Sequence, residues 1–144
     1  MSFIDRVKAY DANAMLGALL TTSTRFDATM RGLEVTRVAP GVVEARLTVH
    51  DGVANTFGTL HGGATATLVD VVGTMALLTL DVAKPGVTVE LGSSYVNAAK
   101  IGEPVLIVGR VLKAGKRLGF TEVTLTRERD GALVATGRHT KAFA

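Results

Sequence analysis

The 144 residues of this chain are enough for one domain with a substantial core but too few for separate cofactor and substrate domains, so we expect a single domain over residues 1–144. Hydrophobic residues make up 47% and charged residues 20%, a balance typical of a globular protein rather than a disordered one. The mild formal charge of +3 argues against a nucleic-acid partner, and the absence of cysteine excludes disulfides, thiolate nucleophiles and zinc–thiolate sites.

Metal and membrane functions are also disfavoured. The histidines His50, His61 and His139 lie far apart in the sequence, so we expect no metal centre. The longest apolar stretch, Leu68 to Leu80, is too short and too often interrupted by polar residues for us to expect membrane insertion. The N-terminal residues do not resemble a secretory signal, so the expected location is cytoplasmic, with mitochondria or another organelle left open.

The first part of the chain predicts a helix followed by a hairpin. Apolar residues recur at helical spacing over about residues 2–20, which predicts an N-terminal amphipathic helix. From Leu33 the pattern changes, and Pro40-Gly41 forms a turn signal before alternating apolar and polar residues up to Val49. We therefore expect a two-stranded hairpin at the start of a domain core that covers about residues 33–142.

The rest of the chain predicts one long helix and four more strands. The helix opens at His61-Gly62-Gly63 and runs to about Asp81, before a stop signal at Lys84-Pro85-Gly86. The four strand candidates, each bounded by turn residues, are Val87 to Tyr95, Val105 to Lys113, Gly119 to Arg127 and Ala132 to Thr140. This pattern predicts an α+β domain in which an antiparallel sheet of about six strands packs round a central helix.

The densest group of potentially functional residues lies where a loop enters the long helix. Asn55 supplies an amide group, His61 an imidazole, and Gly62 and Gly63 an accessible backbone. A helix start offers unpaired N–H groups and a positive dipole end, which suit a developing oxyanion, and glycine lets a carbonyl approach closely. The alternative is a plain loop whose glycines serve the turn and whose histidine bonds locally.

Asp70 is the only ionisable residue between His61 and Asp81, and apolar residues flank it on both sides. Because burying an unpaired carboxylate is costly, Asp70 needs bonding partners, a water-filled cavity or a raised pKa, and the last two suit a general base. The alternative is a structural carboxylate that caps a neighbouring loop.

The spacing of Gly62 and Asp70 constrains any site that uses both residues. On one helix they are roughly 12 Å apart along the axis at about 1.5 Å per residue. A general base must approach its proton to about 3 Å. The two residues can share a site only if a second copy of the helix runs antiparallel beside the first, so such a site lies at a dimer interface.

Several stretches between about Leu33 and Lys141 carry a recognisable pattern. They are Asn55–Asp70 (NTFGTLHGGATATLVD), Thr74–Leu78 (TMALL), Pro85–Val89 (PGVTV), Val111–Lys116 (VLKAGK) and Gly137–Lys141 (GRHTK). They resemble the hotdog-fold thioesterase superfamily, in the branch of the phenylacetate-degradation thioesterases and the thioesterase superfamily member 2 type (acyl-CoA thioesterase 13). The resemblance implies a sheet wrapped round a long central helix, two protomers that join their sheets, and dimers that pair into a homotetramer.

The resemblance also implies roles for individual residues. The Gly62 N–H would polarise the thioester carbonyl in a pocket shaped by His61 and Asn55, while Asp70 of the partner subunit orients or activates water. Thr88 lies where human-type enzymes have a serine that helps to place the water, and Ala142 lies where they have a histidine near the ligand. The implied substrate contacts are Gly63, Glu90, Tyr95, Asn97, Lys100, Lys113, Lys116, Arg117 and Leu118.

The cations in this set suit CoA phosphates on chemical grounds as well, although a solvated hairpin turn is the alternative for Lys113, Lys116 and Arg117. We therefore expect an enzyme that hydrolyses a fatty or aryl acyl-CoA with water and with no metal or organic cofactor. A non-catalytic acyl-CoA-binding module is one alternative, but it has no use for a desolvated base. A hotdog hydratase or dehydratase is another, but it usually needs a histidine beside a carboxylate, whereas His61 lies in the loop-to-helix motif.

Overall fold

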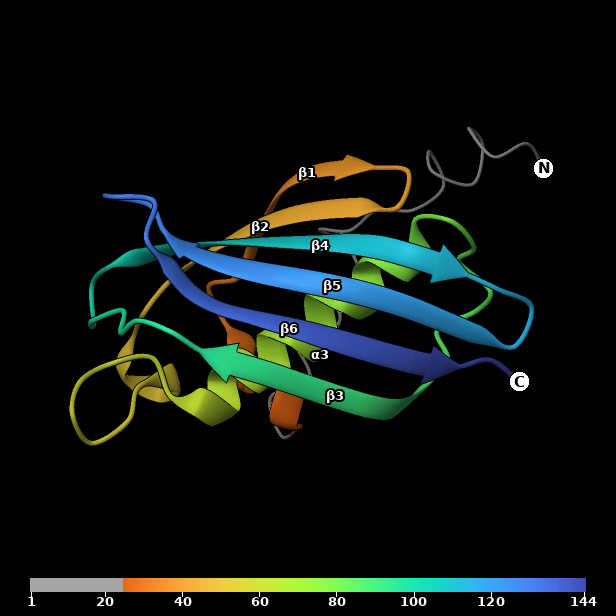
Figure 1. The fold of residues 1–144 in the computed structure, drawn as a ribbon. Coiled ribbons are helices and arrows are strands. Elements are labelled where there is room, and N and C mark those ends of the chain that lie inside the picture. Colours follow the sequence, from red (N-terminus) through yellow and green to blue (C-terminus); the bar gives the residue numbers. More distant parts are fainter. Residues whose placement is uncertain (1–24) are drawn as a thin grey trace.

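A computed structural model describes residues 25–144, which form an antiparallel six-stranded sheet wrapped around one long helix (Figure 1). The strand order is β1-β2-β4-β5-β6-β3. In chain order the elements are η1 (Phe26–Met30), β1 (Glu34–Ala39), β2 (Val42–Thr48), η2 (Asp51–Val53), α3 (Gly62–Leu78), β3 (Val87–Tyr95), β4 (Pro104–Ala114), β5 (Leu118–Arg127) and β6 (Leu133–Ala142). The fold class predicted from the sequence is confirmed, while the helix predicted over about residues 2–20 lies outside the described residues.

The predicted elements agree closely with the observed ones. The β1–β2 hairpin turns at Gly41, whose φ of 72° is accessible to glycine, and β3 has the predicted bounds. Helix α3 begins where the sequence predicts but ends at Leu78 instead of near Asp81. Its last turn tightens at Thr79, whose hydroxyl bonds the carbonyl of Ala76 and accepts the N–H of Gly41. The second bond links the end of the helix to the β1–β2 turn.

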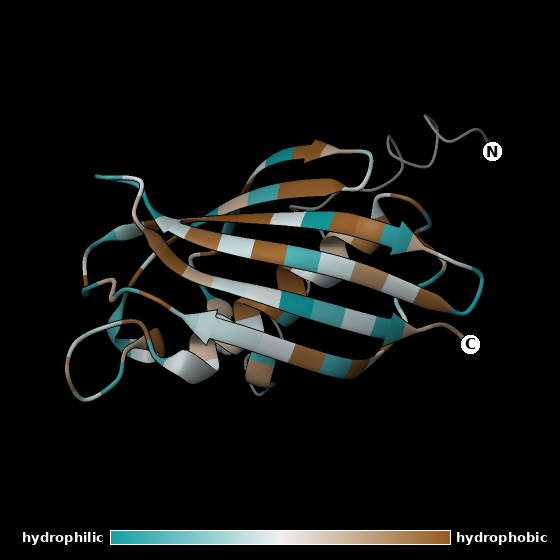
Figure 2. Ribbon diagram, in the orientation of Figure 1, coloured by the Kyte–Doolittle hydropathy of each residue, from teal (hydrophilic) through white to brown (hydrophobic). Residues whose placement is uncertain are grey.

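The core lies between α3 and the concave face of the sheet. Along the strands, apolar and polar residues alternate (Figure 2), so that one face packs on the helix. Val69, Val72 and Met75 of α3 are fully buried, as are the sheet residues Ile107 and Leu125. Helix α3 is apolar on most of its faces because the sheet curls around it.

Strand β3 forms one edge of the sheet and is poorly covered. None of its residues is buried, and the side chains of Val87, Val89 and Tyr95 are 66%, 58% and 59% exposed. Within residues 25–144, β3 pairs with β6 alone, so its outer N–H and C=O groups have no strand partner. A long, uncovered edge of this kind is a ready template for another strand.

Candidate active site

The start of α3 is capped by the side chain of His61. Its Nδ1 accepts a hydrogen bond of 2.8 Å from the Gly63 N–H, which leaves Nε2 to carry the hydrogen of the neutral ring. Since the cap occupies the Gly63 N–H, the neighbouring N–H of Gly62 keeps no hydrogen-bond partner among residues 25–144. It lies at the positive end of the helix dipole, so His61 orders the helix start and leaves one donor open.

The loop before α3 is organised by Asn55. Its Oδ1 accepts the N–H groups of Phe57 and Thr59 at 2.9 and 3.1 Å, and its Nδ2 donates to the Thr59 hydroxyl at 2.9 Å. A carboxamide nitrogen has two hydrogens, so one of them remains for a further acceptor. Asn55 therefore holds the loop while it keeps one donor for a ligand.

A hollow of about 350 Å³ lies beside the start of α3. It brings together Asn55 and Gly62 with Tyr95 from the end of β3 and Asn97 just after it. The Tyr95 ring lies over Gly62, because a Cβ added to Gly62 would approach Tyr95 Cε1 to 3.5 Å. Four of the residues singled out in the sequence thus line one hollow, next to the open N–H of Gly62.

Asp70 lies farther along α3 in a separate cluster that includes Thr88. The Thr88 hydroxyl donates to Asp70 Oδ1 at 2.9 Å, and His139 Nε2 lies 3.1 Å from the same oxygen. The His139 hydrogen bond, supported by that of Thr88, holds the pKa of the Asp70 carboxyl below its ordinary value of 3.8 despite partial burial. Of the three possibilities considered from the sequence, bonding partners are the one observed, and the side chain is 47% exposed. The raised pKa considered for this carboxylate is wrong, because its hydrogen bonds outweigh the effect of burial.

His139 was given no role in the sequence analysis, although it lies in the GRHTK stretch. Its side chain is fully buried, and its Nε2 lies 2.7 Å from the Thr88 hydroxyl. Because that hydroxyl gives its hydrogen to Asp70, Nε2 carries a hydrogen and donates. Its Nδ1 faces Gly73, where an added Cβ would lie only 2.8 Å away. Alternation along β6 could have indicated that His139 points inward, but not that it meets Asp70.

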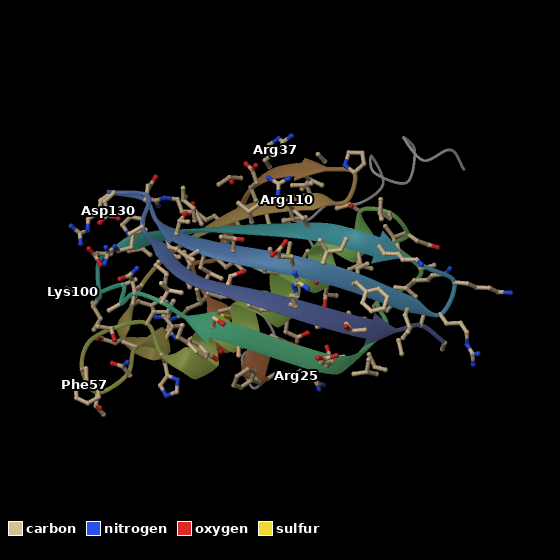
Figure 3. The ribbon with its side chains drawn as sticks, viewed as in Figure 1. Arg25, Arg37, Phe57, Lys100, Arg110 and Asp130 are labelled. Atoms are coloured by element: carbon tan, nitrogen blue, oxygen red, sulfur yellow. The ribbon has the colours of Figure 1, made fainter. Side chains whose placement is uncertain are left out.

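The remaining implied substrate contacts are dispersed over the protomer. Lys100 lies at the end of the molecule where the loop carrying Phe57 precedes α3 (Figure 3). The turn between β4 and β5 projects at the opposite end of the sheet (Figure 1) and carries exposed residues, which are Lys113, Lys116, Arg117 and Leu118. Glu90 lines a different hollow, together with Glu122 and Arg138. One protomer therefore does not gather these groups around the Gly62 hollow.

One protomer does not bring Gly62 and Asp70 together either. Both lie on α3, about two turns apart, or roughly 12 Å along the axis. The protomer thus contains two half-sites, an open donor at the start of α3 and a bonded carboxylate in its middle.

No helix of residues 25–144 is long and apolar enough to cross a bilayer. The same residues contain no group of three or more histidine, aspartate or glutamate side chains placed to hold a metal ion.

Comparison with known proteins gives consistent matches over most of the chain. Human acyl-coenzyme A thioesterase 13 is 44% identical over 122 residues, which cover 85% of this chain and 87% of that protein. The crystal structure of zebrafish thioesterase superfamily member 2 superposes with a TM-score of 0.86 at 44% identity, covering 91% of this chain and 94% of that one. A Streptococcus mutans protein bound to acetyl-CoA superposes with a TM-score of 0.73 at 25% identity, covering 78% and 88%.

The sequence profile of the thioesterase superfamily matches residues 57–134, a range that runs from the loop before α3 into β6. Together with the relatives above and the hotdog arrangement of sheet and helix, this match identifies the family. The chain belongs to the thioesterase superfamily.

Proposed function

We propose that this protein hydrolyses acyl-CoA thioesters, with a water molecule as nucleophile. The observation that carries the proposal is the Asp70 carboxylate, which lies in a helix otherwise made of uncharged residues and is held by Thr88 and His139. The names of the relatives and the acetyl-CoA bound to the Streptococcus mutans protein support the substrate class. The open Gly62 N–H supplies the second element that such a reaction needs, a donor for the carbonyl oxygen.

The chemistry follows from these two half-sites. The thioester carbonyl oxygen accepts the Gly62 N–H, and the positive end of α3 favours the charge that develops on this oxygen. Asp70 Oδ1 is occupied by Thr88 and His139, so Oδ2 is the oxygen left to accept a proton from water. The water oxygen bonds to the carbonyl carbon as its proton passes to Asp70. Collapse of the tetrahedral intermediate then breaks the C–S bond and releases CoA, which takes up the proton, and the free acid.

The proposal includes a homodimer in which the two half-sites come from different protomers. The uncovered edge of β3 supports it, since two copies of this edge could pair about a two-fold axis and continue the sheet. Such pairing is antiparallel, so it brings opposite ends of the two protomers together. It would place Asp70 of the partner subunit near the Gly62 hollow. The pairing of dimers into a homotetramer, which the family resemblance implies, is part of the same proposal, and sedimentation velocity measures it.

The position of His139 bears on the hydratase alternative, because a histidine does lie beside the carboxylate. Its side chain is completely buried, however, and its Nε2 is engaged by both Thr88 and Asp70. The ring can orient Asp70, but its other nitrogen, Nδ1, is buried, so no exposed edge remains from which to exchange protons with a substrate. The geometry therefore favours hydrolysis over hydration.

The direct test is incubation with a panel of fatty and aryl acyl-CoA esters, with release of free CoA thiol as the measurement. Hydrolysis of at least one ester at a saturable rate is expected. Tight binding without thiol release would instead indicate a binding module, and water addition to an enoyl-CoA would indicate a hydratase.

Thr88 should act through its hydroxyl. Thr88→Val keeps the shape and the β-branched side chain of an edge strand but removes the hydrogen bond to Asp70. We expect kcat to fall by about 10- to 100-fold, the range for a hydrogen bond to a charged group of about 1.5–3 kcal/mol. Thr88→Ser, which keeps the hydroxyl, should stay within about threefold of the wild type on the same scale. Equal loss in both variants would mean that the methyl group, not the hydroxyl, matters.

The β4–β5 turn should bind the phosphates of CoA. Neutralising Lys116 and Arg117 together as glutamines should raise KM by about tenfold with little change in kcat, because remote phosphate contacts act mainly on binding. Added salt should produce the same change in the wild type. The matched control is neutralisation of Arg37 and Arg110, which lie on β1 and β4 away from the turn (Figure 3). An unchanged KM in the turn variant would show that Lys116 and Arg117 do not bind the phosphates and belong to a solvated turn.

A further inference from the structure

Lys141 is a buried cation that the mechanism above does not use. It lies on β6, and it is 6% exposed, the only lysine or arginine among residues 25–144 that is buried. Its Nζ donates to the Thr74 hydroxyl at 2.8 Å. Burying an ammonium group costs free energy unless an opposite charge lies nearby. Lys141 therefore needs an anion as its counter-charge.

The arrangement of β3, β6 and α3 points to Asp70 as that anion. Thr74 follows Asp70 by one helical turn and so lies on the same face of α3. On the sheet side, Lys141 is the register partner of Thr88 and lies two residues after His139, on the same face of β6. Asp70 is thus bordered by the two groups that bond it, Thr88 and His139, and by the ammonium that is anchored one turn farther along the helix.

We propose that Lys141 is a positioning residue for hydrolysis, whose ammonium, held on Thr74, is the counter-charge that keeps Asp70 ionised when the partner subunit and the substrate exclude water. This inference rests on the proposed function. Its physical reason is that closing the site removes water from the carboxylate, which favours the neutral acid, whereas a neighbouring cation opposes that change.

Few charged groups lie near Asp70 among the described residues, so the effect of the Lys141 charge on its ionisation can be measured separately. The His139 hydrogen bond is the main influence that lowers the pKa of Asp70, and the charge of Lys141 acts in the same direction. Burial lowers the pKa of Lys141, and the charge of Asp70 partly offsets that lowering. Among residues 25–144, the other titratable group facing Asp70 is His139 on β6. Strand β3 contributes the Thr88 hydroxyl and β5 the Thr121 hydroxyl beside Gly73. The charged residues nearest along β3, β5 and β6 line a different hollow; they are Glu90, Glu122 and Arg138.

A stabilising role would not require a charge at this position. An apolar side chain of similar length would fill the same space without the cost of burying an ammonium. We therefore expect Lys141→Met to unfold at a temperature no lower than the wild type in acid, where Asp70 is protonated and needs no counter-charge. A purely structural lysine would instead show a lower unfolding temperature when its hydrogen bond to Thr74 is removed.

The decisive experiment compares Lys141→Met with Lys141→Arg, Thr74→Val and the wild type in the full-length protein. Arg138→Met is the matched control, because it removes one positive charge from the opposite face of the same strand. The first readout is the titration of the Asp70 carboxyl carbon by ¹³C NMR, which needs no turnover. The second is the acid limb of the pH profile of kcat, which reports the pKa of the base in the enzyme–substrate complex, where the site is closed.

In Lys141→Met, both the carboxyl titration and the acid limb should move to higher pH, while the activity on the high-pH plateau stays within about threefold. Lys141→Arg should restore the wild-type profile, Thr74→Val should give a smaller shift in the same direction, and Arg138→Met should give none. An unchanged Asp70 titration, or a lower plateau without a shifted limb, would overturn the inference. A wild type that hydrolyses no thioester would overturn the proposed function, and the carboxyl titration would still decide whether Lys141 controls the ionisation of Asp70.

Discussion

Asp70→Asn should lower kcat by roughly 10²–10⁴-fold, the range expected for loss of a general base. Asparagine keeps the shape of the side chain and an oxygen that can accept from Thr88 and His139, so the cluster should persist. What it loses is the negative charge and the proton acceptor at Oδ2. The measurement is the rate of CoA thiol release at saturating acyl-CoA, and KM should change little because Asp70 acts on water rather than on the CoA moiety.

Two controls separate this effect from a general loss of structure. Asp81→Asn removes a carboxylate just after α3 that pairs at 3.8 Å with Lys84, and it should leave kcat near the wild-type value. The second control is the dependence of stability on pH. Because the pKa of Asp70 is lowered in the folded state, its ionised form stabilises the fold above the ordinary value of 3.8, and this contribution disappears as the pH falls through the folded value.

Asp70→Asn should therefore unfold at a somewhat lower temperature than the wild type at pH 7, and the difference should close in acid. An active Asp70→Asn protein would show that another group activates the water.

Mixed dimers of two inactive variants should recover activity. Gly62→Val keeps Asp70 but blocks the approach of a carbonyl to the start of α3, because its methyl groups extend beyond the Cβ position that already lies 3.5 Å from Tyr95. Asp70→Asn keeps the open N–H but lacks the base. The two halves lie roughly 12 Å apart on one helix. In the proposed dimer they are joined only across the interface, so a heterodimer of the two variants has one site with both intact halves.

The expected size of the recovery makes this a quantitative test. After unfolding and refolding of an equal mixture, about half of the dimers are mixed and each has one intact site of two, so about a quarter of wild-type activity should return. Differential affinity tags isolate the mixed species. Gly62→Ala is the matched control, because a single Cβ makes ordinary contact with Tyr95 and should leave the fold intact. Mixed dimers that form and stay inactive would show that Gly62 and Asp70 do not serve one site.

The sequence predicted the elements well because their signals are local. His61 and the two glycines after it marked the start of α3, and alternation together with turn residues marked β3, β4, β5 and β6. Asp70 could be singled out for a local reason as well, since it is a lone charge within an apolar helix. The spacing along that helix was also enough to predict that Gly62 and Asp70 do not meet within one protomer.

The partners of Asp70 were decided by the tertiary structure. Strand β3 precedes β4 in the chain but pairs with β6, so Thr88 and His139 come together across a long-range pairing that no local pattern specifies. The strand register also shifts between Thr88 and Glu90. Thr88 therefore contacts Asp70, whereas Glu90 lines a different hollow. Alternation shows which strand residues face the helix, whereas strand order and register decide which of them touch. The sequence thus determined the helix, its start at His61-Gly62-Gly63 and its lone carboxylate, and the folding of the sheet around them decided that this carboxylate lies among Thr88, His139 and Lys141.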